Sequence, residues 1–149
     1  MCSPPKKGDA SYESYWTEYN GIFSSLKERA ALLARKLNSI RGVSCQAVHG
    51  AMYAFPHITL PPRYAEHNTV QNKKEGRKLE VDARWALELL ERSGIVVVPG
   101  SGFGQEPDTL HFRTTILPPT EQMERMVSAI REFQDHIYLH WSDSCCAEG

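Results

Sequence analysis

No excess of charge of either sign is present in this chain of 149 residues, because 17 lysine and arginine residues nearly balance 18 aspartate and glutamate residues. A field of one sign would attract nucleic acid or an anionic membrane, so neither partner is expected. The one basic cluster, in residues 73–78, is interrupted by Glu75 and Gly76. Such a cluster is typical of a solvated loop rather than of a phosphate-binding patch.

Long apolar runs are also absent. The longest aliphatic run, from Ile95 to Val98, is far too short to cross a bilayer. The first residues are basic but lack the apolar run of a secretory signal. We therefore expect a cytoplasmic protein, and a mitochondrial location of a longer parent stays open because a targeting segment would precede Met1.

Cysteines are few, and their spacing does not predict a metal site. The four cysteines include no CxxC pair, and the adjacent Cys145 and Cys146 could form only a strained disulfide, so reduced thiols are expected. His136 and His140 have the i,i+4 spacing of zinc ligands on a helix, but no glutamate follows His136 as HExxH requires. We expect no bound metal.

The remaining composition is that of one folded domain. Hydrophobic residues make up 41% of the chain, which is enough for a packed core at this length. Residues 1–11 are expected to form an extended N-terminal segment, residues 12–140 the domain, and residues 141–149 a flexible tail.

Apolar residues at i,i+3 and i,i+4 spacing predict three helices. The first covers residues 12–41 and is longer than a small domain needs, so part of it is expected to contact a neighbour. The second has Asp82 as its N-cap and ends at Gly94, and the third has Thr120 as its cap. The polar residues 63–78 are expected to form a loop with at most one helical turn.

Alternating apolar and polar residues predict two strand pairs between these helices. Residues 43–47 and 52–60 are expected to form a hairpin, and residues 95–98 and 110–117 a second pair. This order favours an α/β (α+β) fold. We expect a two-layer sandwich in which helices cover one face of a small, mostly antiparallel sheet.

Three glycines surround Phe103 in the segment before the last strand. Gln105 breaks the GxGxxG pattern and no lysine follows as a Walker A motif requires, so a nucleotide cradle is not favoured. A tight connection between strands needs fewer glycines. The composition favours a loop that passes close to another backbone or to a ligand, with Gly102, Phe103 and Gly104 at its centre.

Arg113 is the strongest candidate for a binding residue. It lies between Phe112 and Thr114 in an alternating strand, where a partly buried arginine needs an anionic partner. Its planar guanidinium can bind a carboxylate through two parallel hydrogen bonds. The alternative is that Arg113 faces solvent on the side of the strand opposite to Phe112.

Several motifs resemble, in the expected order, the C-terminal part of the alanine aminotransferase family. They are GDASY at 8–12, GAMYAFP at 50–56, LLERSGI at 89–95, VPGSGFGQ at 98–105, TLHFR at 109–113 and TILP at 115–118. The resemblance covers roughly residues 4–139. That family is similar to the wider fold type I pyridoxal phosphate (PLP) enzymes, in which a large domain holds the cofactor and a small C-terminal domain closes over the substrate.

The resemblance implies transfer of an amino group between alanine and 2-oxoglutarate, giving pyruvate and glutamate by a ping-pong route on PLP. It implies that Arg113 binds the carboxylate of the amino acid or 2-oxo acid, which orients the substrate against the cofactor. Gly102, Phe103 and Gly104 would lie along the substrate cleft without performing a chemical step. A homodimer is implied for the full-length parent.

The resemblance is also incomplete. In the family, the lysine that attaches PLP lies upstream of the part that this chain resembles, in the large domain. We therefore expect no catalytic residue here, no bound PLP and no activity of the chain alone. Residues 106–108 replace what is often a glycine, and the tail beyond Leu139 has no counterpart. A standalone amino-acid-binding or regulatory module that uses Arg113 without catalysis is the alternative.

Overall fold

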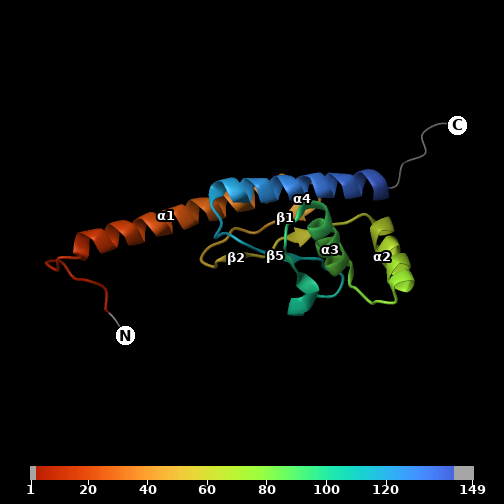
Figure 1. The fold of residues 1–149 in the computed structure, drawn as a ribbon, viewed down its shortest axis with the longest axis horizontal. Coiled ribbons are helices and arrows are strands. Elements are labelled where there is room, and N and C mark those ends of the chain that lie inside the picture. Colours follow the sequence, from red (N-terminus) through yellow and green to blue (C-terminus); the bar gives the residue numbers. More distant parts are fainter. Residues whose placement is uncertain (1–2, 143–149) are drawn as a thin grey trace.

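The computed structural model describes residues 3–142 (Figure 1). In chain order the elements are helix α1 (Tyr12–Leu37), strands β1 (Val43–Ser44), β2 (Tyr53–Ala54) and β3 (His57–Ile58), helices α2 (Pro62–Glu75) and α3 (Val81–Ser93), strand β4 (Val98–Pro99), the 3-10 turn η1 (Gly100–Phe103), strand β5 (Phe112–Thr115) and helix α4 (Thr120–Trp141). The strands pair antiparallel, and the helices pack against them. The predicted fold class is confirmed.

The central sheet has the strand order β2-β5-β4, so β5 lies in the middle. Ala54 pairs with Thr114, and Val98 pairs with Arg113. Strands β1 and β3 form a separate antiparallel pair, which a single bridge between His57 and His111 connects to the segment that leads into β5. The middle strand therefore brings residues from both halves of the chain to one place.

The predicted hairpin strand over residues 52–60 is divided at Pro56. Its first part, β2, pairs with β5, and its second part, β3, pairs with β1. Proline has no backbone N–H group to donate to a ladder, so a continuous central strand cannot run through it. The Pro56 carbonyl instead accepts a hydrogen bond from the Phe112 N–H group at 3.1 Å. The hairpin prediction is right for β3 and wrong for β2.

One face of β5 forms the base of the hydrophobic core. Phe112, Thr114 and Ile116 are buried on this face. The Trp85 ring of α3 lies 5.0 Å from the Phe112 ring and 5.7 Å from the Phe133 ring of α4, measured between centroids. Helices α3 and α4 therefore cover the same face of β5, and the alternate residues Arg113 and Thr115 belong to the other face.

Only the second half of α1 packs against this core. Its buried residues begin at Ala30, whereas Ile22 in its first half is 61% exposed. The first half extends away from the sheets (Figure 1). The helix ends at Leu37, earlier than predicted, and the side chain of the next residue, Asn38, exchanges hydrogen bonds of 2.8 and 2.9 Å with the backbone of Cys45. No helix within residues 3–142 has the length and apolar character needed to cross a membrane.

The prediction of a loop over residues 63–78 is wrong, because α2 occupies most of that stretch. The helix starts at Pro62, whose fixed φ angle suits the first helical position. Its buried residues are Tyr64 and Asn68, and the Tyr64 hydroxyl donates to the Glu88 carboxylate of α3 at 2.7 Å. A search for hydrophobic periodicity could not reveal a helix whose inner face is attached through polar groups.

An ion pair between α2 and α3 makes a testable contribution to stability. Arg84 is 4% exposed and donates to both oxygens of Glu75, at 2.9 and 3.0 Å. These hydrogen bonds lower the pKa of Glu75 below its ordinary value of 4.5. Because the folded-state pKa is lowered, the stabilisation is present above that ordinary value and is lost as the pH falls through the lowered pKa.

We therefore expect Glu75→Gln to lower the urea midpoint near neutral pH and to have little effect in strong acid. Urea denaturation of both proteins over a series of pH values measures the difference. A difference that stays constant from neutral to strongly acidic pH would contradict the assignment of this ion pair.

Candidate functional site

The guanidinium of Arg113 lies over two aromatic rings that come from distant parts of the chain. Its central carbon is 4.6 Å from the ring centre of Tyr53 in β2 and 4.6 Å from that of Phe103 in η1. Tyr53 is brought there by the pairing of β2 with β5, in which it lies opposite Thr115. The attraction of a cation to an aromatic ring keeps the guanidinium in place without using a hydrogen-bond acceptor.

Arg113 is half-buried, and no acid in the described part of the chain pairs with it. Within residues 3–142 its side chain takes part in no salt bridge and no hydrogen bond. Its position on the face opposite to Phe112 agrees with the solvent-facing alternative. A solvent-facing position is also compatible with anion binding. A half-buried guanidinium whose N–H groups have no partner within residues 3–142 can bind an anion from solution.

The glycine segment, Gly100 to Gly104, lies beside Arg113 and includes η1. A β-carbon at Gly100 would meet the Gln105 side chain and would lie 2.8 Å from the His111 β-carbon, so only glycine fits there. Gly104 has a φ angle of +71°, which also favours glycine. Gly102 is exposed with open space around it. The expected close approach to another backbone occurs at Gly100, and Phe103 at the centre of the segment contacts Arg113.

Asp82 does not cap α3, so that prediction is wrong. Glu80 occupies the N-cap position, and no side chain caps the helix there. The Asp82 carboxylate is 1% exposed and accepts hydrogen bonds from the Ser101 N–H group at 2.6 Å and from Gln105 Nε2 at 3.0 Å. In the sequence, an aspartate at the start of a predicted helix is typical of an N-cap. The contact between Asp82 and the glycine segment joins distant parts of the chain, so the sequence pattern does not reveal it.

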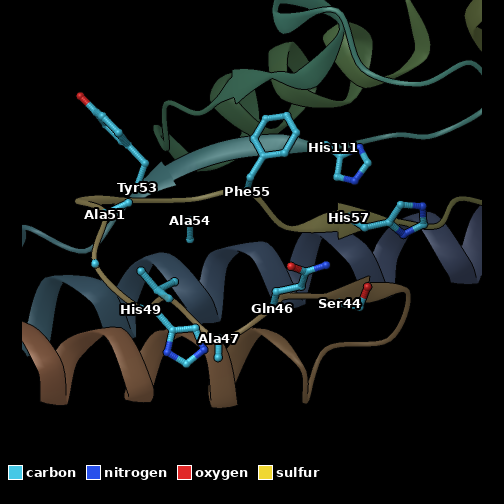
Figure 2. Close-up of a pocket in the computed structure, with 12 residues that line it drawn as sticks. Ser44, Gln46, Ala47, His49, Ala51, Tyr53, Ala54, Phe55, His57 and His111 are labelled. Carbon is cyan, nitrogen blue, oxygen red and sulfur yellow. The ribbon is translucent and has the colours of Figure 1, made fainter.

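A cavity of about 410 Å³ adjoins this arrangement and shares Tyr53 with it (Figure 2). Figure 2 shows Tyr53 and Phe55 on the same side of the segment that leads to His57. Phe55 stacks on the His111 ring with centroids 4.9 Å apart and meets the Phe103 ring edge-on at 5.9 Å. The aromatic residues therefore form a continuous surface from the cavity to Arg113.

His111 is held in this aromatic surface by contacts with Phe55 and Gln105. Burial, followed by the neighbouring His57, lowers the pKa of His111, whereas Asp82 acts in the opposite direction. Its Nδ1 lies 3.2 Å from the Gln105 Oε1 atom. A neutral imidazole with its proton on Nδ1 can donate to that oxygen.

No lysine of this chain is suited to attach PLP. Of the seven lysines, all but Lys36 are exposed, and Lys36 is half-buried and forms an ion pair with Glu124 at 2.6 Å. Covalent attachment requires a lysine that can lose its proton, which normally takes a desolvated pocket. The lysines of this chain therefore do not fit the cofactor's point of attachment.

The structure also gives no support for a metal centre. Within residues 3–142, no group of three or more histidine, cysteine, aspartate or glutamate side chains is arranged to hold a metal ion. The rings of His136 and His140 lie 3.9 Å apart on α4. The adjacent Cys145 and Cys146 lie outside the described residues.

Comparison with known proteins places these features in a family. Residues 8–130 match the family described as aminotransferase class I and II. The chain is 48% identical over 133 residues to alanine aminotransferase 2, mitochondrial, of Arabidopsis thaliana. The matched region is 89% of this chain and 24% of that protein. It is 41% identical over 144 residues to glutamate–glyoxylate aminotransferase 2 of the same plant, a match that covers 97% of this chain and 29% of that protein.

A solved structure agrees with this relationship. Alanine aminotransferase from Pyrococcus furiosus superposes with a TM-score of 0.63 at 31% identity, over 83% of this chain and 26% of that one. The chain thus spans about a quarter of the length of these relatives. The predicted resemblance to alanine aminotransferases is confirmed. The relatives include mitochondrial proteins, so the cytoplasmic location stays a prediction. Because the family match extends over residues 8–130, which is most of its length, this chain belongs to the class I and II aminotransferase family.

Proposed function

We propose that this chain is the substrate-carboxylate-binding part of an alanine aminotransferase, with Arg113 as the residue that binds the carboxylate. The full-length parent then converts L-alanine and 2-oxoglutarate into pyruvate and L-glutamate. The observation that carries the proposal is a half-buried guanidinium that lies over two aromatic rings and has no acidic partner within residues 3–142. The relatives named as alanine aminotransferases support the reaction class.

Binding and orientation are what these residues contribute. Both substrates of the proposed reaction carry a carboxylate next to the reacting carbon, so one guanidinium can bind each of them in turn. Two parallel hydrogen bonds fix a carboxylate in position and in rotation. The rings of Tyr53 and Phe103 restrict the guanidinium, so that less side-chain freedom is lost when the substrate binds.

The cofactor belongs to another part of the proposed assembly. The family generally depends on PLP, and the large domain would supply its lysine, its phosphate site and the partner surface of a homodimer. Glycine segment residues 102–104 then lie along the substrate cleft and exclude water from one side of it. Among the relatives are glutamate–glyoxylate aminotransferases, so alanine as the preferred donor is part of the proposal.

A chimeric enzyme tests this function directly. In it, the present chain replaces the matching 133 residues of the Arabidopsis alanine aminotransferase 2. We expect the chimeric enzyme to carry out alanine and 2-oxoglutarate transamination, measured by pyruvate formation, and the 149-residue chain mixed with PLP to show neither turnover nor a protein-bound cofactor absorbance band. An inactive chimeric enzyme that is folded and binds PLP would contradict the proposal.

The second candidate is an amino-acid-binding module that works without catalysis. One observation favours it: Arg113, Tyr53 and Phe103 are assembled entirely from this chain. Calorimetric titration of the 149-residue chain with alanine and with 2-oxoglutarate separates the candidates. A guanidinium in an open half-site competes with water and should bind them negligibly, whereas tight binding that Arg113→Ala abolishes would favour the module.

A further inference from the structure

A buried carboxylate without a cation lies directly behind the glycine segment. Asp82 is 1% exposed, and within residues 3–142 it forms no salt bridge. It accepts three hydrogen bonds instead, from the backbone N–H groups of Ala83 and Ser101 and from Gln105 Nε2. Burying a charge is unfavourable unless hydrogen bonds satisfy it, so this arrangement needs a structural or functional reason.

The hydrogen bonds that Asp82 accepts attach both ends of the glycine segment. Ser101 lies near its start, and Gln105 follows its last glycine. The amide of Gln105 points its nitrogen to the Asp82 carboxylate and its oxygen to His111 Nδ1. The Gly100 N–H group donates to the His111 carbonyl at 2.7 Å. The segment is thereby connected to α3 on one side and to the residue before β5 on the other.

Phe103 lies between these two attachment points and is 47% exposed, so burial does not determine where its ring goes. The ring nevertheless lies over the guanidinium of Arg113 at 4.6 Å. Arg113 in turn has no hydrogen bond that would orient it among the described residues 3–142. The position of the guanidinium therefore depends on the rings beside it, and the position of Phe103 depends on the attached ends of its segment.

We propose that Asp82 and Gln105 are positioning residues for Arg113: their hydrogen bonds keep Phe103 over the guanidinium, so that the N–H donors face an incoming carboxylate. This inference rests on the proposed role of Arg113. It assigns to α3, on the core side of the sheet, control over the affinity of a site on the other side. The glycine segment is the physical connection between the two.

NMR spectroscopy of the 149-residue chain tests the positioning without any enzymatic activity. Ring currents from Phe103 shift the Arg113 side-chain resonances, and Phe103→Leu provides the reference for their loss. Asp82→Ala removes the acceptor, so its Arg113 resonances should move most of the way to that reference. Asp82→Asn keeps an oxygen that can accept from Ser101 and Gln105, so its resonances should stay near those of the wild type. Unchanged resonances in Asp82→Ala would overturn the proposal.

Gln105→Met provides a second variant, since methionine has a length similar to that of glutamine and cannot form the hydrogen bonds to Asp82 and His111. It keeps the test available if Asp82→Ala does not fold. Glu75→Gln is the matched control, because it disturbs a polar contact of α3 that does not reach the glycine segment. The control should leave the Arg113 resonances in place.

Steady-state kinetics of the chimeric enzyme test the consequence. We expect Asp82→Ala and Gln105→Met each to raise the KM for alanine about tenfold with a smaller change in kcat, because a misplaced guanidinium weakens binding in the ground state and the transition state alike. The double variant should be no worse than the stronger single variant, since both break one network. Asp82→Asn should restore most of the affinity, and Glu75→Gln should leave KM unchanged.

The two proposals fail in different ways. If Asp82→Ala leaves both the Arg113 resonances and the KM unchanged while Arg113→Ala raises the KM, the positioning proposal is wrong and the carboxylate site stands. If Arg113→Ala itself leaves the KM unchanged, the proposed function of Arg113 is wrong, and the NMR result alone then reports whether Asp82 orders the segment.

Discussion

Replacing Arg113 with lysine is expected to lower kcat/KM for alanine by about thirtyfold or more in the chimeric enzyme, because losing one partner of a hydrogen-bonded charge pair costs about 2–5 kcal/mol. Lysine keeps the positive charge but cannot form two parallel hydrogen bonds to a carboxylate. Arg113→Ala should be at least as severe. Initial rates over a range of alanine concentrations measure the effect.

The control for this prediction is Arg125→Lys, a change of the same kind at an exposed position on α4. It should leave kcat/KM within about twofold of the wild type, as is usual for a surface substitution away from a site. The folded state should tolerate Arg113→Lys, since Arg113 forms no hydrogen bond or salt bridge within residues 3–142. A kcat/KM equal to that of the control would sink the assignment of Arg113.

Trp85→Ala is expected to lower the free energy of unfolding by about 3–5 kcal/mol, the usual cost of removing a buried tryptophan. Trp85 is 0% exposed and packs between Phe112 of β5 and Phe133 of α4. Its indole N–H group donates to Gln134 Oε1 at 3.1 Å. Urea denaturation followed by circular dichroism is the suitable measurement, because the substitution removes a fluorophore.

Trp85→Phe separates packing from hydrogen bonding at the same position. It keeps an aromatic ring in the core but leaves the buried Gln134 oxygen without its donor, which should cost about 1–3 kcal/mol. Leu139→Ala is the control for truncation of a large apolar side chain, since Leu139 is 78% exposed. A loss in Trp85→Ala no larger than that in Leu139→Ala would mean that α3 does not contribute to the core as described.

The main helices could be predicted from the sequence because their inner faces are apolar. In α4 the residues Met123, Val127, Ile130, Phe133 and Ile137 are buried in the order that their spacing predicts. Helix α2 was not predicted because polar groups, rather than an apolar face, hold it against α3, as in the hydrogen bond between Tyr64 and Glu88. The division of the second hairpin strand at Pro56 likewise depends on which strands are available as partners, and a local pattern does not contain that information.

At the candidate site, the sequence by itself determined the alternation that puts Arg113 on the face of β5 opposite to Phe112, because side chains in a strand alternate sides. The sequence also determined that residues 100–104 can adopt a conformation that other residues would not fit. Glycine tolerates the positive φ angle of Gly104 and the close contacts of Gly100. Only the tertiary structure decided that Tyr53 and Phe103 meet the guanidinium and that Asp82 lies behind the segment rather than capping its helix. Those contacts join residues far apart in the chain, and their energies depend on distances that exist only once the sheet and the helices have packed.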